Sequence, residues 1–179
     1  ALPSQILDRN DRLITEYFSD EKRDIAAIDT LPPHLVYALI TAEDRNFFKH
    51  RGIDLLGTLR AQWNNMFGTY FSGASSISQQ VAGELYTDRT VISYKRKLIE
   101  LWYAFQMERH LTKYQILELY MNTVYLGHNT HGVEAASQFY FGKSAQDINL
   151  AEAAILVVQI RSPARYSMIN HPNDARDRQ

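Results

Sequence analysis

Two adjacent carboxylates, Glu43 and Asp44, end an apolar helical stripe and are followed by aromatic residues, a histidine and a glycine. A carboxylate half desolvated by Phe47 and Phe48 is expected to have its pKa raised toward the working pH, as a general base requires. The simpler interpretation is a charged helix end in solvent, because most Asp and Glu side chains are hydrated. Glu43 is therefore the first candidate for acid–base chemistry.

The element that must position Glu43 is a helix beginning near Pro32 and Pro33, with Asp29 or Thr30 as its expected cap. Its apolar residues recur at i, i+3, i+4 and i+7 and are Leu35, Ala38, Leu39 and Ala42. Glu43 follows directly, so we expect it at the edge of the buried face.

A second polar segment, residues 73–80, opens another expected helix. Ser76 and Gln79 have the spacing of a capping box, which alone accounts for both side chains. A glycine and two serines before a helix also make an anion site, since free backbone N–H groups and hydroxyls would point at a phosphate. Ser76, Gln80 and Gly83 share one helical face. The segment predicts a capped helix, and an anion site is the alternative with a function.

A third group is charged: Arg96, Lys97 and Glu100 lie on a helix expected from about Ser93 to His110. Arg96 and Glu100 are four residues apart, so a surface salt bridge worth roughly a few tenths of a kcal/mol also explains them. The residues expected to be buried on this helix are Leu98, Leu101, Trp102 and Phe105.

The remaining elements are mostly helices too. From Asp54, a candidate N-cap, an apolar and aromatic stripe runs to Phe67 and fits either a core helix or a segment that dips into a membrane. Further helices are expected after the capping pair Thr112 and Gln115, at residues 133–140 before Gly142, and at residues 149–159. Apolar pairs on either side of residues 8–11 suggest a small N-terminal hairpin or arm. The predicted fold class is mainly α.

Composition excludes several kinds of protein. The 179 residues fit one domain, and the lack of cysteine removes thiolate nucleophiles, disulfides and cysteine-type zinc sites. With 19 Lys and Arg against 20 Asp and Glu, the net charge of −1 gives no global basic field, so no nucleic-acid partner is expected. No apolar run is long enough to span a membrane, and no signal-peptide pattern opens the chain.

Together, five stretches in fixed order resemble the family 51 glycosyltransferases, the peptidoglycan polymerases found as monofunctional enzymes and as the first domain of class A penicillin-binding proteins. The motifs are E-D-x-x-F-x-x-H-x-G at Glu43, Asp44, Phe47, His50 and Gly52; G-x-S-T-x-T-Q-Q at Gly73, Ser75, Ser76, Ser78, Gln79 and Gln80, with serine in both threonine positions; R-K-x-x-E at Arg96, Lys97 and Glu100; K-x-x-I-L-x-x-Y-x-N at Lys113, Ile116, Leu117, Tyr120 and Asn122; and R-x-P at Arg161 and Pro163. The resemblance covers roughly residues 4 to 172, so one chance match matters little.

The resemblance implies a lysozyme-like helical domain on the periplasmic side of the inner, cytoplasmic membrane. It implies polymerisation of lipid II and of the growing lipid-linked glycan into β-1,4-linked strands, with inversion and release of undecaprenyl pyrophosphate. Glu43 would be the general base, and Glu100 a second catalytic residue that holds a divalent cation, Mg²⁺ or Mn²⁺, in part. The substrate-binding residues that it implies are Asp44, Ser75, Ser76, Gln79, Gln80, Arg89, Arg96 and Lys97. The supporting residues are Phe47, His50, Gly52, Gly73, Tyr120, Asn122 and Arg161.

The chain departs from the family pattern at a position that matters for binding the donor phosphates. Members usually carry a lysine three residues after the paired glutamines, reaching the donor phosphates, whereas this chain has Gly83 there. The segment from Arg89 to Glu100 is also about three residues longer than is common. Arg89 or Lys95 replaces the missing cation in one hypothesis, and donor binding is weakened in the other.

Two alternatives to a polymerase remain. A lysozyme-like hydrolase would also use a glutamate after a helix, but the paired glutamines and the basic cluster have no evident use in hydrolysis. A non-catalytic domain that only binds lipid-linked glycan is the more serious alternative, because of Gly83. We expect residues 1–30 to be an arm following a membrane anchor absent from this sequence and residues 31–179 to be the glycosyltransferase domain, cut at its C-terminal edge. A transpeptidase domain following in the full-length protein is compatible with the resemblance.

Overall fold

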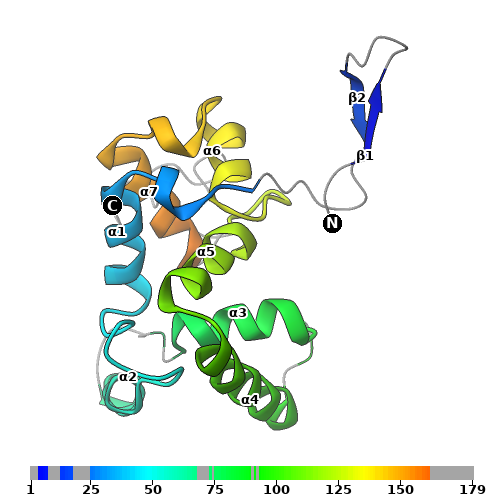
Figure 1. Ribbon diagram of the computed structural model, residues 1–179. Coiled ribbons are helices and arrows are strands. Elements are labelled where there is room, and N and C mark those ends of the chain that lie inside the picture. The colour runs from blue at the N-terminus through cyan, green and yellow to red at the C-terminus, as the bar shows by residue number, and fades with distance from the viewer. Residues whose placement is uncertain are drawn as a thin grey trace. The chain divides into compact units, whose positions relative to one another are not determined.

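The computed structural model describes residues 4–7, 13–17, 25–67, 73, 75–89, 91 and 93–161. The chain divides into two compact units, one made of residues 1–35 and 124–179 and the other of residues 36–123. Both are built mainly from helices, as the sequence predicts (Figure 1). The expected boundary between an arm at 1–30 and a domain at 31–179 stays a prediction.

The first unit contains the predicted N-terminal hairpin. Strands β1 (Ser4–Leu7) and β2 (Leu13–Tyr17) pair antiparallel, from Ser4 opposite Tyr17 to Leu7 opposite Leu13, with a register shift between Ile6 and Leu7. This confirms the hairpin expected from the apolar pairs on either side of residues 8–11.

The same unit also contains η1 (Ile28–Thr30), α6 (Val133–Phe141), η2 (Ala145–Asp147) and α7 (Leu150–Arg161). Gly142 ends α6 in the left-handed conformation at φ +67°, which confirms the predicted glycine stop. Burial raises the pKa of Tyr140 to about 12, so its hydroxyl stays protonated and donates to the Leu126 carbonyl at 2.8 Å.

The second unit is organised around α3. Its helices are the C-terminal part of α1 (Pro33–Glu43), together with α2 (Leu55–Phe67), α3 (Ile77–Tyr86), α4 (Tyr94–His110) and α5 (Lys113–Thr123). Helix α3 packs against both α4 and α5, and α4 lies beside it in Figure 1. Its buried positions include Ser78, Ala82 and Gly83, whose small side chains let the neighbouring helices approach closely.

The structure corrects two predictions about helix ends and faces. Asp29 and Thr30 do not cap α1, because both lie in η1 and the Thr30 hydroxyl donates to the Ala27 carbonyl. On α4 the predicted buried face is wrong: Leu98, Trp102 and Phe105 are exposed, whereas the buried side chains are those of Glu100, Ala104 and Met107. These three lie at i, i+4 and i+7, so α4 buries a different stripe.

Helix α2 leaves its large apolar side chains exposed. The exposed residues are Leu55, Leu56, Leu59, Trp63, Met66 and Phe67, all more than half accessible. A core role for this part of α2 is therefore wrong; Tyr70 and Phe71, which continue the stripe, lie outside the described residues. Within the described part of the chain, no helix has the length and hydropathy needed to cross a membrane.

Candidate active site

The candidate base Glu43 is the last residue of α1 and is half-buried. The side-chain amide of Gln80, on α3, donates from Nε2 to Glu43 Oε2 at 2.9 Å. The other end of the same amide, Oε1, accepts a hydrogen bond from the Tyr120 hydroxyl at 3.3 Å. A chain of two hydrogen bonds thus runs from α5 through α3 to the carboxylate at the end of α1.

Tyr120 is suited to remain a donor in that chain. Its side chain is fully buried, and burial, followed by the nearby charge of Glu43, raises the pKa of the phenol well above its ordinary value. A phenol that stays protonated fixes the Gln80 carbonyl toward itself and hence the Gln80 NH₂ toward Glu43. Sequence reasoning assigned Tyr120 to scaffold and Gln80 to substrate binding; spacing alone gave no signal that both act on Glu43.

Asp44 has a different environment from its neighbour Glu43. It is buried, and its Oδ2 accepts from His50 Nε2 at 2.8 Å and from the Ile77 backbone N–H at 3.1 Å, at the start of α3. Phe47 is fully buried and meets the His50 ring edge-on, with centroids 6.2 Å apart. Asp44 therefore ties the end of α1 to α3, and its predicted role in binding substrate stays a prediction.

Gly52 shows why the first motif ends in glycine. Its φ is +88°, a conformation that other residues rarely adopt, and a Cβ there would lie 3.3 Å from the Ala104 carbonyl oxygen of α4. The Gly52 carbonyl accepts a hydrogen bond from the Ser76 hydroxyl. The close approach thus ties the loop after Glu43 to α4 and to the N-terminal cap of α3.

The predicted capping box at α3 is confirmed. Ser76 Oγ accepts from the Gln79 N–H at 3.2 Å, and Gln79 Oε1 accepts from the Ser76 N–H at 3.0 Å. Both side chains are buried, and the Ser76 hydroxyl and Gln79 Oε1 are engaged in the cap and in the bond to Gly52. Their predicted contacts with a substrate stay predictions.

The charged cluster gathers around Glu100, which is buried, so the pairing is not the surface salt bridge considered above. Arg96 pairs with Glu100 Oε1, and Lys97 Nζ lies 3.0 Å from Oε2. Lys97 Nζ also donates to Ser75 Oγ at 2.8 Å, in the segment before α3. Lys97 thus links the segment before α3 to Glu100, and Arg96 pairs with the other oxygen of the same carboxylate.

Gly83 is the point on α3 that Glu100 approaches. A Cβ at Gly83 would lie 3.2 Å from Glu100 Oε1, tighter than an ordinary contact. Gln80 and Gly83 are three residues apart, so Glu43 and Glu100 approach α3 about one turn from each other, roughly 4.5 Å along its axis. One face of α3 therefore joins the candidate base to the cationic cluster.

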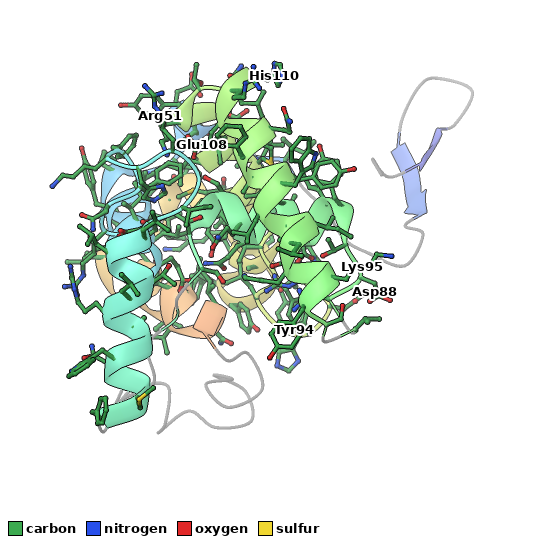
Figure 2. The ribbon with its side chains drawn as sticks, turned by 90° about the horizontal axis from the view of Figure 1, so that it is seen from below. Arg51, Asp88, Tyr94, Lys95, Glu108 and His110 are labelled. Atoms are coloured by element: carbon green, nitrogen blue, oxygen red, sulfur yellow. The ribbon has the colours of Figure 1, made fainter. Side chains whose placement is uncertain are left out.

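The two cations suggested to replace the missing lysine have other surroundings. Arg89 is half-exposed and pairs with Glu84 at 3.1 Å, and Lys95 is exposed near the start of α4. Figure 2 shows Lys95 and Tyr94 at that same end of the helix. The replacement hypothesis stays a prediction, whereas Arg96 and Lys97 flank the carboxylate that touches Gly83.

Three supporting residues lie away from these contacts. Asn122 donates to the Glu118 carbonyl within α5, and a Cβ added at Gly73 would lie in open space. Arg161 ends α7 in the other unit, and its side chain and Pro163 lie outside the described residues. Their predicted roles stay predictions.

The residues do not form a protein-only metal site. Both oxygens of Glu100 face cations, and no group of three or more His, Cys, Asp and Glu side chains suited to a metal occurs in the described ranges. In this arrangement Glu100 is an acceptor for Arg96 and Lys97, which does not fit direct metal ligation. The arrangement offers a hydrogen-bonded carboxylate for proton transfer and, one helical turn away, cations for a negatively charged group.

Comparison with known proteins agrees with the family that the five motifs indicate. The family model described as Transglycosylase matches residues 10–179. Penicillin-binding protein 1A of Aquifex aeolicus is 39% identical over 176 residues, 98% of this chain and 24% of that protein. Penicillin-binding protein 1A of Neisseria flavescens is 40% identical over 179 residues, 99% of this chain and 22% of that protein. Penicillin-binding protein 4 of Bacillus subtilis is 35% identical over 178 residues, 98% of this chain and 28% of that protein.

The chain thus spans about a quarter of the length of these curated relatives. Among solved structures, penicillin-binding protein 1A from Haemophilus influenzae matches with a TM-score of 0.49 and 21% identity, covering 99% of this chain and 17% of that chain.

Proposed function

The chain belongs to the transglycosylase family, and we propose that it is a peptidoglycan glycosyltransferase that polymerises lipid II into β-1,4-linked glycan with inversion, using Glu43 as general base. The observation that carries this proposal is the environment of Glu43: a half-buried carboxylate held by Gln80, one turn along α3 from a cationic cluster. The mainly α, lysozyme-like fold expected for this family agrees with the helices described above.

The proposed reaction needs a base because an alcohol is too weak an acid to ionise first. The 4-hydroxyl oxygen of the acceptor sugar attacks the anomeric carbon of the growing chain while Glu43 takes the hydroxyl proton. The bond from the anomeric carbon to the pyrophosphate oxygen breaks, and its electron pair leaves with undecaprenyl pyrophosphate. A positioned base contributes roughly 10²- to 10⁴-fold to such a step.

Negative charge then grows on the pyrophosphate and needs donors fixed in advance. In this proposal Arg96, Lys97 and the Ser75 hydroxyl supply them, and Glu100 keeps the two cations aligned rather than binding the substrate itself. A divalent cation, if it takes part, would come with the substrate phosphates, the usual way in which Mg²⁺ binds; none of the steps above is assigned to it.

A membrane partner follows from the same substrate, since undecaprenyl pyrophosphate is a lipid. The support is α2, whose apolar residues from Leu55 to Phe67 are exposed and would enter the outer face of the cytoplasmic membrane. The periplasmic location, an anchor before this chain and a transpeptidase domain after it remain predictions from the family resemblance.

The test is polymerisation of lipid II by this chain in detergent or liposomes, with products resolved by length, beside Glu43→Gln. We expect glycan ladders that disappear in Glu43→Gln while lipid II binding is retained, because the amide cannot accept the proton. Glu84→Gln, which removes the partly buried carboxylate that pairs with the exposed Arg89, is the matched control and should keep the ladder. Bound lipid II without product from the unaltered chain would instead establish the non-catalytic alternative that Gly83 raises.

A further inference from the structure

A pocket of about 550 Å³ lies at the C-terminal end of α4, away from the cluster around Glu100. It is lined by residues 48–51, by the α4 residues Phe105, Glu108 and Arg109, and by Leu111 and Lys113. All belong to the unit of residues 36–123. In Figure 2 Arg51 and Glu108 lie near this end of α4, opposite the end that carries Tyr94 and Lys95.

The pocket has an excess of positive charge. Lys113 Nζ lies 2.7 Å from Glu108 Oε1, so the single carboxylate of the lining already has a counter-charge. Lys49, Arg51 and Arg109 also line the pocket, and no carboxylate in the described part of the chain pairs with them. Three cations gathered at one hollow attract an anion and raise its local concentration.

Helix capping explains only part of this charge. Basic residues near a helix C-terminus interact favourably with the helix dipole, which accounts for Arg109 in the last turn of α4. Lys49 and Arg51 come from a different segment, the loop after α1. That loop is held against α4 by the close approach of Gly52 to Ala104, so its cations are brought to the pocket by the fold.

The walls are aromatic. Phe48 and Phe105 are each about half-exposed, and the Arg109 guanidinium lies 5.9 Å from the Phe105 ring centroid. Arginines match phosphate oxygens with paired hydrogen bonds, and apolar walls favour a ligand that carries an organic group beside its charge. This combination fits a phosphate ester better than a bare inorganic ion.

The pocket adjoins the candidate active site without sharing its reacting groups. His50 lines the pocket and also holds Asp44 through Nε2, while its Nδ1 is buried and has no hydrogen-bond partner in the described structure. Such an atom is the kind that an ordered ligand or water satisfies. Glu43, Gln80, Arg96, Lys97 and Glu100 are absent from the lining.

We propose that this pocket is a second binding site, for a phosphate ester such as a phospholipid headgroup or a soluble glycerol or sugar phosphate. Arg51 and Arg109 bind the phosphate oxygens, Lys49 adds charge at the rim, and Phe48 and Phe105 contact the organic part. The proposal does not depend on polymerase activity, and Glu43→Gln should leave this binding intact.

The test measures binding of glycerol phosphate by calorimetry and of vesicles by sedimentation, with phosphatidylglycerol in phosphatidylcholine against phosphatidylcholine alone. The variant is Arg51→Gln with Arg109→Gln, and Lys49→Gln serves if the double variant does not fold by circular dichroism. Arg45→Gln removes the same charge from an exposed arginine of the same unit that does not line the pocket, and is the matched control.

We expect the double variant to weaken binding roughly tenfold or more, as loss of two charge-assisted hydrogen bonds would, and Arg45→Gln to change it less than about twofold. If vesicle binding follows the same pattern, the source is a lipid headgroup; if only glycerol phosphate does, it is a soluble ester. No saturable binding of either probe, or equal weakening by Arg45→Gln, would overturn the proposal.

Discussion

Two carboxylates approach the same face of α3 and are held in opposite ways. Glu43 receives a hydrogen bond from the neutral amide of Gln80, whereas Glu100 pairs with the two cations Arg96 and Lys97. A neutral donor orients a carboxylate and leaves it able to accept a proton, while two cations make the other carboxylate a counter-ion. Two glutamates one helical turn apart along α3 thus have different roles. Glu43 is the proposed base, and Glu100 holds two cations in position.

We expect the largest effect from Glu100→Gln, which removes the negative charge that Arg96 and Lys97 share. Glu100 is buried, but Arg96 and Lys97 are partly accessible, so the cations left without it are partly hydrated and we expect a loss of roughly 1–3 kcal/mol of unfolding free energy. We also expect kcat for polymerisation to fall roughly 10²-fold, the scale for losing a fixed transition-state donor, because Arg96 and Lys97 lose their alignment. Urea denaturation and the ladder assay measure the two effects.

The matched control is Glu84→Gln, which removes the partner of the exposed Arg89; because that arginine is hydrated, the change should cost less than about 1 kcal/mol. Equal losses in both variants would show that Glu100 has no special role beyond its charge.

Tyr120→Phe tests the other half of the contrast. It removes the donor to Gln80 Oε1, so the amide loses its fixed orientation; we expect kcat to fall several-fold and unfolding free energy to fall by about 1 kcal/mol. Tyr114→Phe, on the exposed side of the same helix, is the control and should change neither. An unchanged kcat in Tyr120→Phe would remove Tyr120 from the chain that orients Glu43.

The pKa of Tyr120 gives this variant a signature at alkaline pH. Because burial raises the pKa of the phenol in the folded state, its contribution to stability is fully present below the unfolded value near 10 and is lost as pH rises toward the folded value. The stability gap between the unaltered chain and Tyr120→Phe should therefore narrow above about pH 10, as followed by denaturation at several pH values.

The capping and packing predictions show what the sequence could and could not supply. Ser76 with Gln79 and Thr112 with Gln115 were recognisable because a cap is made within four residues. The buried face of α4 was not, because Leu98 and Trp102 are the more apolar residues and yet α3 packs on the stripe of Glu100 and Ala104. Which stripe of α4 is buried depends on where α3 packs, and the hydrophobicity of the α4 sequence alone does not predict that.

Substitutions at Gly83 test the cationic cluster around Glu100. Gly83→Lys adds an ammonium near the cationic cluster, and Gly83→Met adds similar bulk without charge; both place a Cβ about 3.2 Å from Glu100 Oε1, so that carboxylate must move slightly. We expect KM for lipid II to be roughly two- to fivefold lower in Gly83→Lys than in Gly83→Met, the scale of a partly exposed ion pair. Equal KM values in the two variants would mean that a lysine at position 83 does not improve binding of lipid II by this chain.

The smallest effect is expected at Asp54, which belongs to neither region and sets the baseline. Hydrogen bonds from the Asn46 amide and the Gly57 N–H lower the pKa of Asp54, which caps α2. Its contribution is therefore present above its ordinary value of 3.8 and is lost as pH falls through the folded value.

Asp54→Ala should accordingly cost about 1 kcal/mol at pH 7, as cap losses do, and the gap to the unaltered chain should shrink as the pH falls below 3.8. Asp54→Asn keeps a capping oxygen and should show little of this pH dependence. A gap that stays constant with pH would mean that the ionised carboxylate is not the stabilising form.

The bond between Ser76 and the Gly52 carbonyl has a consequence for how this domain tolerates change. Gly52 and Ser76 flank the part of the chain that contains α2, and the hydrogen bond between them holds its two ends together. Holding the ends of a longer segment together costs little, about 0.6 kcal/mol for each doubling of its length. We therefore expect insertions and deletions around α2 to change the apolar surface that this helix exposes while the hydrogen bond between Gln80 and Glu43 is kept.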